Sequence, residues 1–216
     1  TRVRVESLNF RIAQSIASSL ANGIREKGQA SLVVSGGTSP LEIFEHLSLA
    51  TIPWSNVTII LGDDRLVDIN HKDSNEILIT QHLLINHAKT AQYLSLTEPL
   101  LDVLQLKLPF DVVLLGMGLD GHFASLFPDL LDQEHRLFDA EAPHEIYSSE
   151  IPLGDPPHRR RTMGTSLLLN TQRCILLVPN LAKRQLLDHA HTDADIPLYY
   201  LLNQSRRQIE CSDTHF

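Results

Sequence analysis

Only two cysteines, Cys174 and Cys211, occur in this sequence of 216 residues. Two are too few for the disulfide framework of a small secreted domain, so we expect a reduced, cytoplasmic setting. The sequence also lacks an apolar run of membrane length and a secretory signal pattern, and we therefore expect no membrane partner. Internal repeats and low-complexity tracts are missing as well, which leaves a chain of ordinary globular composition.

Basic residues are fewer than acidic residues in this chain. The chain has 18 Lys and Arg against 26 Asp and Glu, a formal net charge of −8. A general nucleic-acid binder needs a basic face to meet the phosphate backbone, so we expect no nucleic-acid partner. A small anionic substrate is not excluded, because it requires only a local positive pocket. The length suits one core, and we expect a single domain over residues 1–216.

Short apolar runs alternate with helical patterns along the chain. The runs typical of buried strands lie at residues 3–5, 32–34, 57–61, 112–115 and 174–178. Helical spacing of apolar residues occurs at 8–24, 41–47, 77–84 and 181–187, and Gly28 can end the first helix. This alternation predicts an α/β fold with a mostly parallel open sheet and helices on both faces. The polar, Pro-rich segment 129–160 is either a long loop or a small lobe over the site.

The segment from Gly116 to Pro128, GMGLDGHFASLFP, is the most informative. It follows an apolar strand, and its glycines allow a tight turn that approaches a ligand closely. His122 stands at the end of this turn, two residues after Asp120, where open α/β sheets build their sites. An imidazole there can accept a proton near neutral pH. The alternative is that His122 merely caps the next helix.

A second segment, SGGTSPLE at residues 35–42, runs from a strand into a helix. We expect Ser39 to be the N-cap, Pro40 the first helical residue, and Glu42 the partner in a capping box. Small residues before a helix expose backbone N–H groups, a geometry that binds phosphate. The alternative is an ordinary strand-to-helix turn.

Two further segments combine charges with strand or helix ends. The first is GDDR at residues 62–65, followed by DSN at 73–75. The second is HRRR at residues 158–161, with Lys183 beyond the next strand. Such charges are more often solvated than functional. At the carboxyl end of a strand they can instead line a site, where the planar fork of an arginine donates two hydrogen bonds to one anion.

Nine other histidines show no metal-ligand spacing with cysteines or carboxylates, and we expect them to be surface or capping residues. They are His46, His71, His82, His87, His135, His144, His189, His191 and His215.

Taken together, these segments resemble the 6-phosphogluconolactonase family. The glycine-rich segment matches its signature Gly-x-Gly-x-Asp-Gly-His-x-Ala-Ser-Leu-Phe-Pro, and the family also has a Ser-Gly-Gly-Ser/Thr loop, Asp-Glu-Arg before Ser-Asn, Arg-x-Thr-x-Thr and Gly-x-x-Lys. This chain departs at Asp64, where the family has Glu, at Met163, where it has Thr, and at Asn180, where it has Gly. Asn tolerates the left-handed backbone better than most residues, so we expect the turn at Asn180 to survive.

The resemblance implies a metal-independent hydrolysis of 6-phospho-D-glucono-1,5-lactone to 6-phospho-D-gluconate in the oxidative pentose phosphate pathway. The enzyme would be a cytoplasmic monomer without a cofactor, acting on a small phosphosugar lactone. It implies that His122 takes a proton from water, that Asp120 orients the imidazole, and that Arg65 stabilises the oxyanion or holds the phosphate. The residues that it implies for substrate and phosphate binding are Ser35, Gly36, Gly37, Thr38, Asp63, Asn75, Gly118, Arg161 and Lys183.

Two alternatives have to be weighed. Glucosamine-6-phosphate deaminases share the fold and a similar Asp-Gly-His turn, but they place a Glu five residues after the His. Phe127 stands at that position here and cannot accept a proton. A phosphosugar-binding paralogue without turnover stays open, given the departures at Asp64, Met163 and Asn180.

Overall fold

Helices and strands alternate along residues 6–216, the range that the computed structural model describes. The strands are β1 (Ala30–Val34), β2 (Val57–Leu61), β3 (Asp63–Arg65), β4 (Gln92–Leu94), β5 (Phe110–Leu115), β6 (Ile146–Ser148), β7 (Arg160–Met163), β8 (Thr171–Leu176) and β9 (Ile209–Cys211). The α-helices are α1 (Leu8–Lys27), α2 (Leu41–Ser48), α3 (Asn75–His82), α4 (Thr165–Leu168), α5 (Leu181–Ala190), α6 (Leu198–Leu202) and α7 (Ser212–His215). Single-turn 3-10 helices are η1 (Trp54–Asn56), η2 (Ala88–Thr90), η3 (Val103–Gln105), η4 (Pro128–Leu130) and η5 (His135–Leu137).

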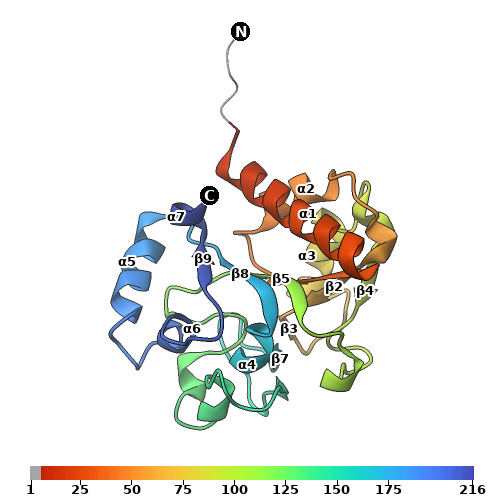
Figure 1. Ribbon diagram of the computed structural model, residues 1–216. Helices are drawn as coiled ribbons and strands as arrows, with labels where there is room; N and C mark the ends of the chain where they lie inside the picture. The colour runs from red at the N-terminus through yellow and green to blue at the C-terminus, as the bar shows by residue number, and fades with distance from the viewer. Residues whose placement is uncertain (1–5) are drawn as a thin grey trace.

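Two sheets organise the described residues. The larger has six strands in the order β4-β2-β1-β5-β8-β9, and every neighbouring pair is parallel. In Figure 1 it runs from β4 on the right to β9 on the left, with α1, α2 and α3 grouped at the right and α5 and α6 at the left. The smaller sheet, β3-β7-β6, is antiparallel. The predicted α/β class with a mostly parallel sheet is confirmed.

The first helix has the expected signals at both ends. Ser7 is its N-cap and accepts a hydrogen bond from the backbone N–H of Phe10 at 3.2 Å. Gly28 ends it in the left-handed conformation, with φ of 76°, and donates to the carbonyl of Ile24 at 2.8 Å. A residue with a side chain would be strained at this φ, so the position of the glycine fixes the end of the helix.

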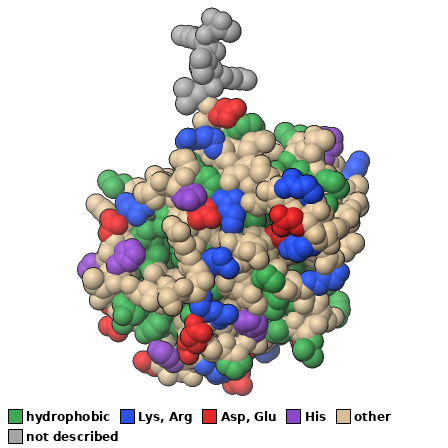
Figure 2. Space-filling view, viewed as in Figure 1, with side chains coloured by type: hydrophobic (Ala, Val, Ile, Leu, Met, Phe, Trp, Pro, Cys, Tyr) green, Lys and Arg blue, Asp and Glu red, His purple; other side chains and the backbone are tan. Residues whose placement is uncertain are grey.

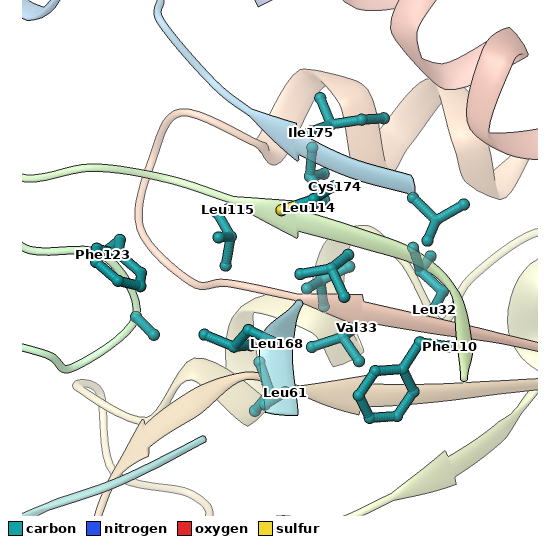
Figure 3. Packing of buried hydrophobic residues seen from close by; sticks show 14 of the residues in the cluster. Leu32, Val33, Leu61, Phe110, Leu114, Leu115, Phe123, Leu168, Cys174 and Ile175 are labelled. Carbon is teal, nitrogen blue, oxygen red and sulfur yellow. The ribbon is translucent and has the colours of Figure 1, made fainter. Parts of the chain in front are cut away.

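The core lies in the centre of the larger sheet. All residues of β1 and β5 are buried, which explains why residues 32–34 and 112–115 within them are continuous apolar runs rather than alternating ones. Figure 3 shows Leu32 and Val33 of β1 packed near Leu114 of β5 and Ile175 of β8. All four have at most 1% of their surface exposed. This rigid centre holds the ends of the strands in place.

Several element boundaries differ from the sequence-based expectations. The strand expected at 174–178 is β8, which begins at Thr171 and ends at Leu176, because its polar first half still pairs with β5. The helix expected at 77–84 begins at Asn75. The strand expected at residues 3–5 lies outside the described residues.

The segment 129–160 is not simply a loop. It contains η4, η5 and β6, and its last residue begins β7. The segment thus supplies all of β6 and the first residue of β7, the strand that pairs with both β3 and β6 in the smaller sheet. Met163 donates its backbone N–H to the carbonyl of Gly62 at 2.8 Å, which joins the smaller sheet to the end of β2.

Charge is mixed over the surface. On the face seen in Figure 2, Lys and Arg side chains lie beside Asp and Glu side chains rather than in one basic area. None of the described helices combines the length and the apolar character needed to cross a membrane.

Candidate active site

A cleft of about 280 Å³ opens at the carboxyl ends of the central strands. The chain leaves β1 and β5, neighbours in the sheet, into loops that line this cleft. After β1 the chain continues to β2 and β4 toward one edge of the sheet, and after β5 it continues to β8 and β9 toward the other edge. The cleft therefore lies where the strand order reverses. Open α/β sheets bind ligands at such a position.

Most of the predicted site residues meet in this cleft. Those that line it are Ser35, Gly36, Gly37, Thr38, Asp63, Arg65, Asn75, Gly118, His122 and Lys183. Lining residues that were not predicted are Ser39, Gly116, Met117, Ala124, Ser125, Phe127, Asp155 and Arg160. Asp120 and Arg161 do not line it.

His122 is held by its own turn. Its Nδ1 lies 2.5 Å from Oδ1 of Asp120, and the same oxygen accepts the backbone N–H of His122 at 3.2 Å. Burial alone raises the pKa of the Asp120 carboxyl, but the hydrogen bond and charge of His122 outweigh it, and the pKa is lowered overall. The carboxylate therefore stays ionised near neutral pH and fixes the imidazole. The alternative role as a helix cap fails, because the next helical turn, η4, has Phe127 as its N-cap.

Glycines make room for this arrangement. A Cβ on Gly118 would lie 2.2 Å from the Cε1 and Nδ1 atoms of His122, so any side chain there would displace the imidazole. Gly121 has a φ of 80°, which lets the chain turn back between Asp120 and His122. The glycines of this segment thus allow the turn that places His122 at the rim of the cleft.

Phe127 lies between the histidine and an arginine. Its ring centroid is 4.3 Å from that of His122, at an interplanar angle of 35°, and 5.4 Å from Cζ of Arg160. An arginine over an aromatic face is attracted by the ring quadrupole. Phe127 gives this wall of the cleft an apolar surface without a proton acceptor.

The loop after β1 and the start of α3 bring polar groups into the cleft, and not all of these groups have hydrogen-bond partners. Ser35 Oγ and Asn75 Oδ1 are buried and have no hydrogen-bond partner among the described residues. A Cβ on Gly36 would lie 2.0 Å from Asn75 Oδ1, so only glycine permits this approach of the loop to α3. Buried polar atoms without partners are rare and suggest a ligand.

The predicted capping box of α2 is wrong. The helix begins at Leu41, its N-cap is Pro40, and no side chain caps it. Ser39 is still in the preceding turn and lines the cleft. Glu42 instead accepts a hydrogen bond from Nδ2 of Asn9 in α1 at 2.6 Å, because α1 and α2 pack together.

The two aspartates after β2 serve different partners. Asp63 lines the cleft and accepts a hydrogen bond from Oγ of Ser125 at 2.6 Å. Asp64 is 1% exposed and accepts from the backbone N–H groups of Arg65 and Asn75, both at 2.7 Å. Ser74, the N-cap of α3, donates to Asp64 as well, at 3.1 Å. Asp64 therefore fixes the start of α3, and burial raises its pKa to about 6 despite these donors.

Arg65 and Arg160 form the cationic wall. They stand directly opposite each other in the β3–β7 pair, and both line the cleft. Arg65 donates through Nη1 to the carbonyl of Asp73, and its Nε is buried without a partner among the described residues. Burial, and secondarily the charge of Arg65, lowers the pKa of Arg160. Like charges opposite each other destabilise a strand pair, and an anion between them would relieve this.

The expectation that Arg161 grips the phosphate is corrected. Arg161 donates through Nε to the carbonyl of Leu96 at 3.0 Å and through Nη1 to Oγ of Ser148 at 2.7 Å. Successive side chains of a strand point to opposite faces, so Arg160 faces the cleft and its neighbour cannot. The arginine run at residues 158–161 predicts that an arginine enters the cleft. Only the register of β7 shows that this arginine is Arg160.

Lys183 lies in the first turn of α5 and lines the cleft, where burial lowers its pKa. The expected left-handed turn at Asn180 is not found. Asn180 is extended, with φ of −155°, and its Oδ1 accepts the backbone N–H of Lys183 at 3.0 Å. Asn180 thus acts as an N-cap and fixes the helix turn that carries the lysine.

One group of side chains in the described range has the composition of a metal site. Ligand atoms of His71, Asp73 and His158 lie within 4.8 Å of one another. His158 Nε2 is already hydrogen-bonded to Asp73 Oδ2 at 2.8 Å, an interaction that lowers the pKa of Asp73. Arg65 donates to the main-chain carbonyl of Asp73, so its positive charge lies close to the group and would repel a cation. His71, which was expected to be a surface or capping residue without metal-ligand spacing, therefore belongs to this group, but we do not assign a metal to it.

The chain is similar to known proteins over most of its length. The family model described as glucosamine-6-phosphate isomerases/6-phosphogluconolactonase matches residues 4–210. A 6-phosphogluconolactonase of Pseudomonas aeruginosa is 34% identical and is aligned over 83% of this chain and 79% of its own; one of Caulobacter vibrioides is 32% identical over 94% and 91%. A crystal structure of a 6-phosphogluconolactonase from Shewanella baltica has a TM-score of 0.81 at 32% identity, covering 94% and 91% of the two chains.

Proposed function

The chain belongs to the glucosamine-6-phosphate isomerase/6-phosphogluconolactonase family, and from this premise we propose that it hydrolyses 6-phospho-D-glucono-1,5-lactone to 6-phospho-D-gluconate. The reaction is a step of the oxidative pentose phosphate pathway. The observation that carries the proposal is the His122–Asp120 pair at the rim of a cleft with a cationic wall.

A lactone is an activated ester, so a positioned water and a base are sufficient for its hydrolysis. With Nδ1 of His122 engaged by Asp120, Nε2 is the nitrogen free to accept a proton from water as the oxygen attacks the lactone carbonyl. The ring C–O bond then breaks, and the proton passes to the leaving ring oxygen, which becomes a hydroxyl. Asp120 stabilises the imidazolium formed in between.

The phosphate and the developing oxyanion are both negative, and the cleft offers positive groups for each. Lys183 comes from the start of α5, and Arg65 and Arg160 come from the smaller sheet. The backbone of residues 36–39 leads into α2 and supplies N–H groups of the kind that bind phosphate. Binding at the phosphate supplies energy for orienting the distant lactone ring.

Amino-sugar phosphate deamination, the other activity in the family description, is disfavoured by one contact. Ring opening in that reaction uses a second carboxylate, a Glu five residues after the histidine, in addition to the aspartate of the turn. The side chain that packs on His122 is Phe127, which cannot exchange a proton. The lactonase reaction does not require such a group.

We further propose a cytoplasmic monomer that needs no cofactor. The base, the cationic groups and the glycine-rich turn that the proposed reaction uses all line one cleft of this chain, which supports the monomer. Cys174 and Cys211 are both free thiols, which fits a reducing compartment.

The direct test adds the purified protein to freshly generated 6-phosphogluconolactone and follows the lactone as it disappears. Loss well above spontaneous hydrolysis at the same pH would support the proposal. Binding of 6-phosphogluconate without accelerated loss would instead identify a non-catalytic phosphosugar-binding paralogue.

A further inference from the structure

Two loops beside the cleft each orient one of its arginines through a backbone carbonyl. In the loop between β3 and α3, the carbonyl of Asp73 accepts from Arg65 Nη1. In the loop before β7, the carbonyl of Leu153 accepts from Nε and Nη2 of Arg160 at 3.0 and 2.9 Å. These contacts are to neutral carbonyls, so both guanidinium groups keep their full charge for a ligand. Their directions depend on where the two loops lie.

A side-chain hydrogen bond ties the two loops together. His158 Nε2 lies 2.8 Å from Oδ2 of Asp73, the same residue whose carbonyl holds Arg65. The backbone of His158 pairs with that of Leu153, whose N–H donates to the His158 carbonyl at 2.9 Å. Asp73 therefore carries the carbonyl that orients Arg65, and His158 is paired through its backbone with Leu153, whose carbonyl orients Arg160.

The surroundings favour this contact over a solvated pair. Both side chains are partly buried, and the ring of His71 packs edge-on against that of His158 at 5.5 Å. The backbone N–H of Asp73 donates to Nδ1 of His71 at 3.1 Å, which further fixes the loop. Partly buried, charge-assisted hydrogen bonds are stronger than exposed ones.

We propose that Asp73 and His158 are positioning residues that direct Arg65 and Arg160 into the cleft. Neither of the pair lines the cleft itself. The inference rests on the proposed function, because the anion that both guanidinium groups would bind is the phosphorylated lactone. Like charges placed opposite each other in β3 and β7 need such external support, and the tie between the loops supplies it.

The test compares His158→Ala with His158→Gln. The amide N–H of Gln can still donate to Asp73, so Gln should keep KM for 6-phosphogluconolactone within about threefold of the wild type. Ala removes the tie and should raise KM by about five- to thirtyfold, while kcat changes by less than about threefold. His189→Ala is the matched control, since His189 pairs with Asp193 at 3.7 Å on the exposed surface and should leave KM unchanged.

Calorimetric titration with 6-phosphogluconate makes the test independent of turnover, and Kd should rise by the same factor as KM. A wild type that binds this ligand without turnover would overturn the proposed function, while the ratio of Kd values would still decide the positioning role. Asp73→Ala is the second variant, with the same expected loss, if His158→Ala does not fold. Unchanged KM and Kd in the Ala variants, or equal losses in His158→Ala and His158→Gln, would overturn the inference.

Discussion

At the scale of single residues, the chemistry depends on how little freedom His122 has. A carboxylate holds one side of its ring, Phe127 covers a face, and Gly118 leaves no more than the space that the ring needs. Preorganised groups of this kind contribute to the rate without a further cost in reorganisation. The same geometry makes the role of the ring easy to isolate, since the imidazole itself makes no hydrogen bond to Arg65 or Arg160 and can be removed while Phe127 stays against Arg160.

His122→Ala should lower kcat for 6-phosphogluconolactone by about two to four orders of magnitude, because water loses its proton acceptor. KM should change little, since the cationic groups remain. Initial rates corrected for spontaneous hydrolysis give the comparison. His135→Ala, which removes a ring packed edge-on against Tyr200 outside the cleft lining, is the control and should retain wild-type kcat. A His122→Ala variant with more than a third of the wild-type kcat would refute the role of the base.

Lys183→Ala should raise KM for the phosphorylated lactone by about 10- to 100-fold, the loss expected for a hydrogen bond to a charged group. Unphosphorylated gluconolactone should be affected much less. Lys107→Ala is the control, because Lys107 bonds to Gln29 outside the cleft lining. An equal rise in KM for the two substrates would mean that Lys183 does not bind the phosphate.

The family resemblance, together with position after a strand, predicted ten of the 18 residues that line the cleft, because parallel strands end at one edge of a sheet. The choice between Arg160 and Arg161 could not be predicted. It depends on the register of β7 against β3, and a shift of one residue exchanges the two faces. The role of Asn180 was also missed, since Asn suits both a left-handed turn and an N-cap.

At the scale of elements, long apolar patterns were predictable and three-residue strands were not. The helix α1 and the strands β1, β2 and β5 carry enough periodic residues to be recognised alone. The strands β3, β4, β6 and β9 have three residues each, and only their pairing partners define them. The smaller sheet, which supplies the cationic wall, was therefore beyond reach of the sequence.

The start of α3 predicts a pH dependence of stability. The pKa of Asp64 is about 6 in the folded chain against 3.8 for an ordinary Asp. Between these values the folded state binds more protons than the unfolded state, so the contribution of Asp64 is fully present below about pH 3.8 and is lost as the pH rises through about 6. It amounts to about 3 kcal/mol at most. Asp64→Asn cannot titrate and should lack this component.

Urea unfolding between pH 4 and 7.5 measures the effect as the difference between wild type and Asp64→Asn. This difference should shift in favour of the variant as the pH rises through about 6. Asp68→Asn, which alters an exposed carboxylate in the same loop, is the control. A difference that does not vary with pH would show that the donors to Asp64 fully compensate its burial.

At the scale of the whole molecule, the cleft lies where the two sheets meet. The larger sheet contributes the loops after β1 and β5, and the smaller sheet contributes Arg65 and Arg160. The sheets share one hydrophobic cluster, which contains Met163 of β7 as well as residues of β1 and β2. A backbone hydrogen bond from Met163 to Gly62 joins them as well. The single domain over residues 1–216 remains a prediction, which an unfolding experiment can test.

A single domain should unfold in one cooperative transition. Trp54, the only tryptophan, is buried beside β2 and hydrogen-bonded to the carbonyl of Ala50 at 2.9 Å, so its fluorescence reports on the larger sheet. Far-ultraviolet circular dichroism reports on the whole chain, and the two urea transitions should coincide. At about a hundred times its Kd, 6-phosphogluconate should stabilise the protein by about 2.7 kcal/mol and shift both transitions equally, because its site needs both sheets. If the ligand shifted the circular dichroism transition but left that of Trp54 unchanged, the smaller sheet and its loops would be a separate folding unit, and the cleft would lie between two domains.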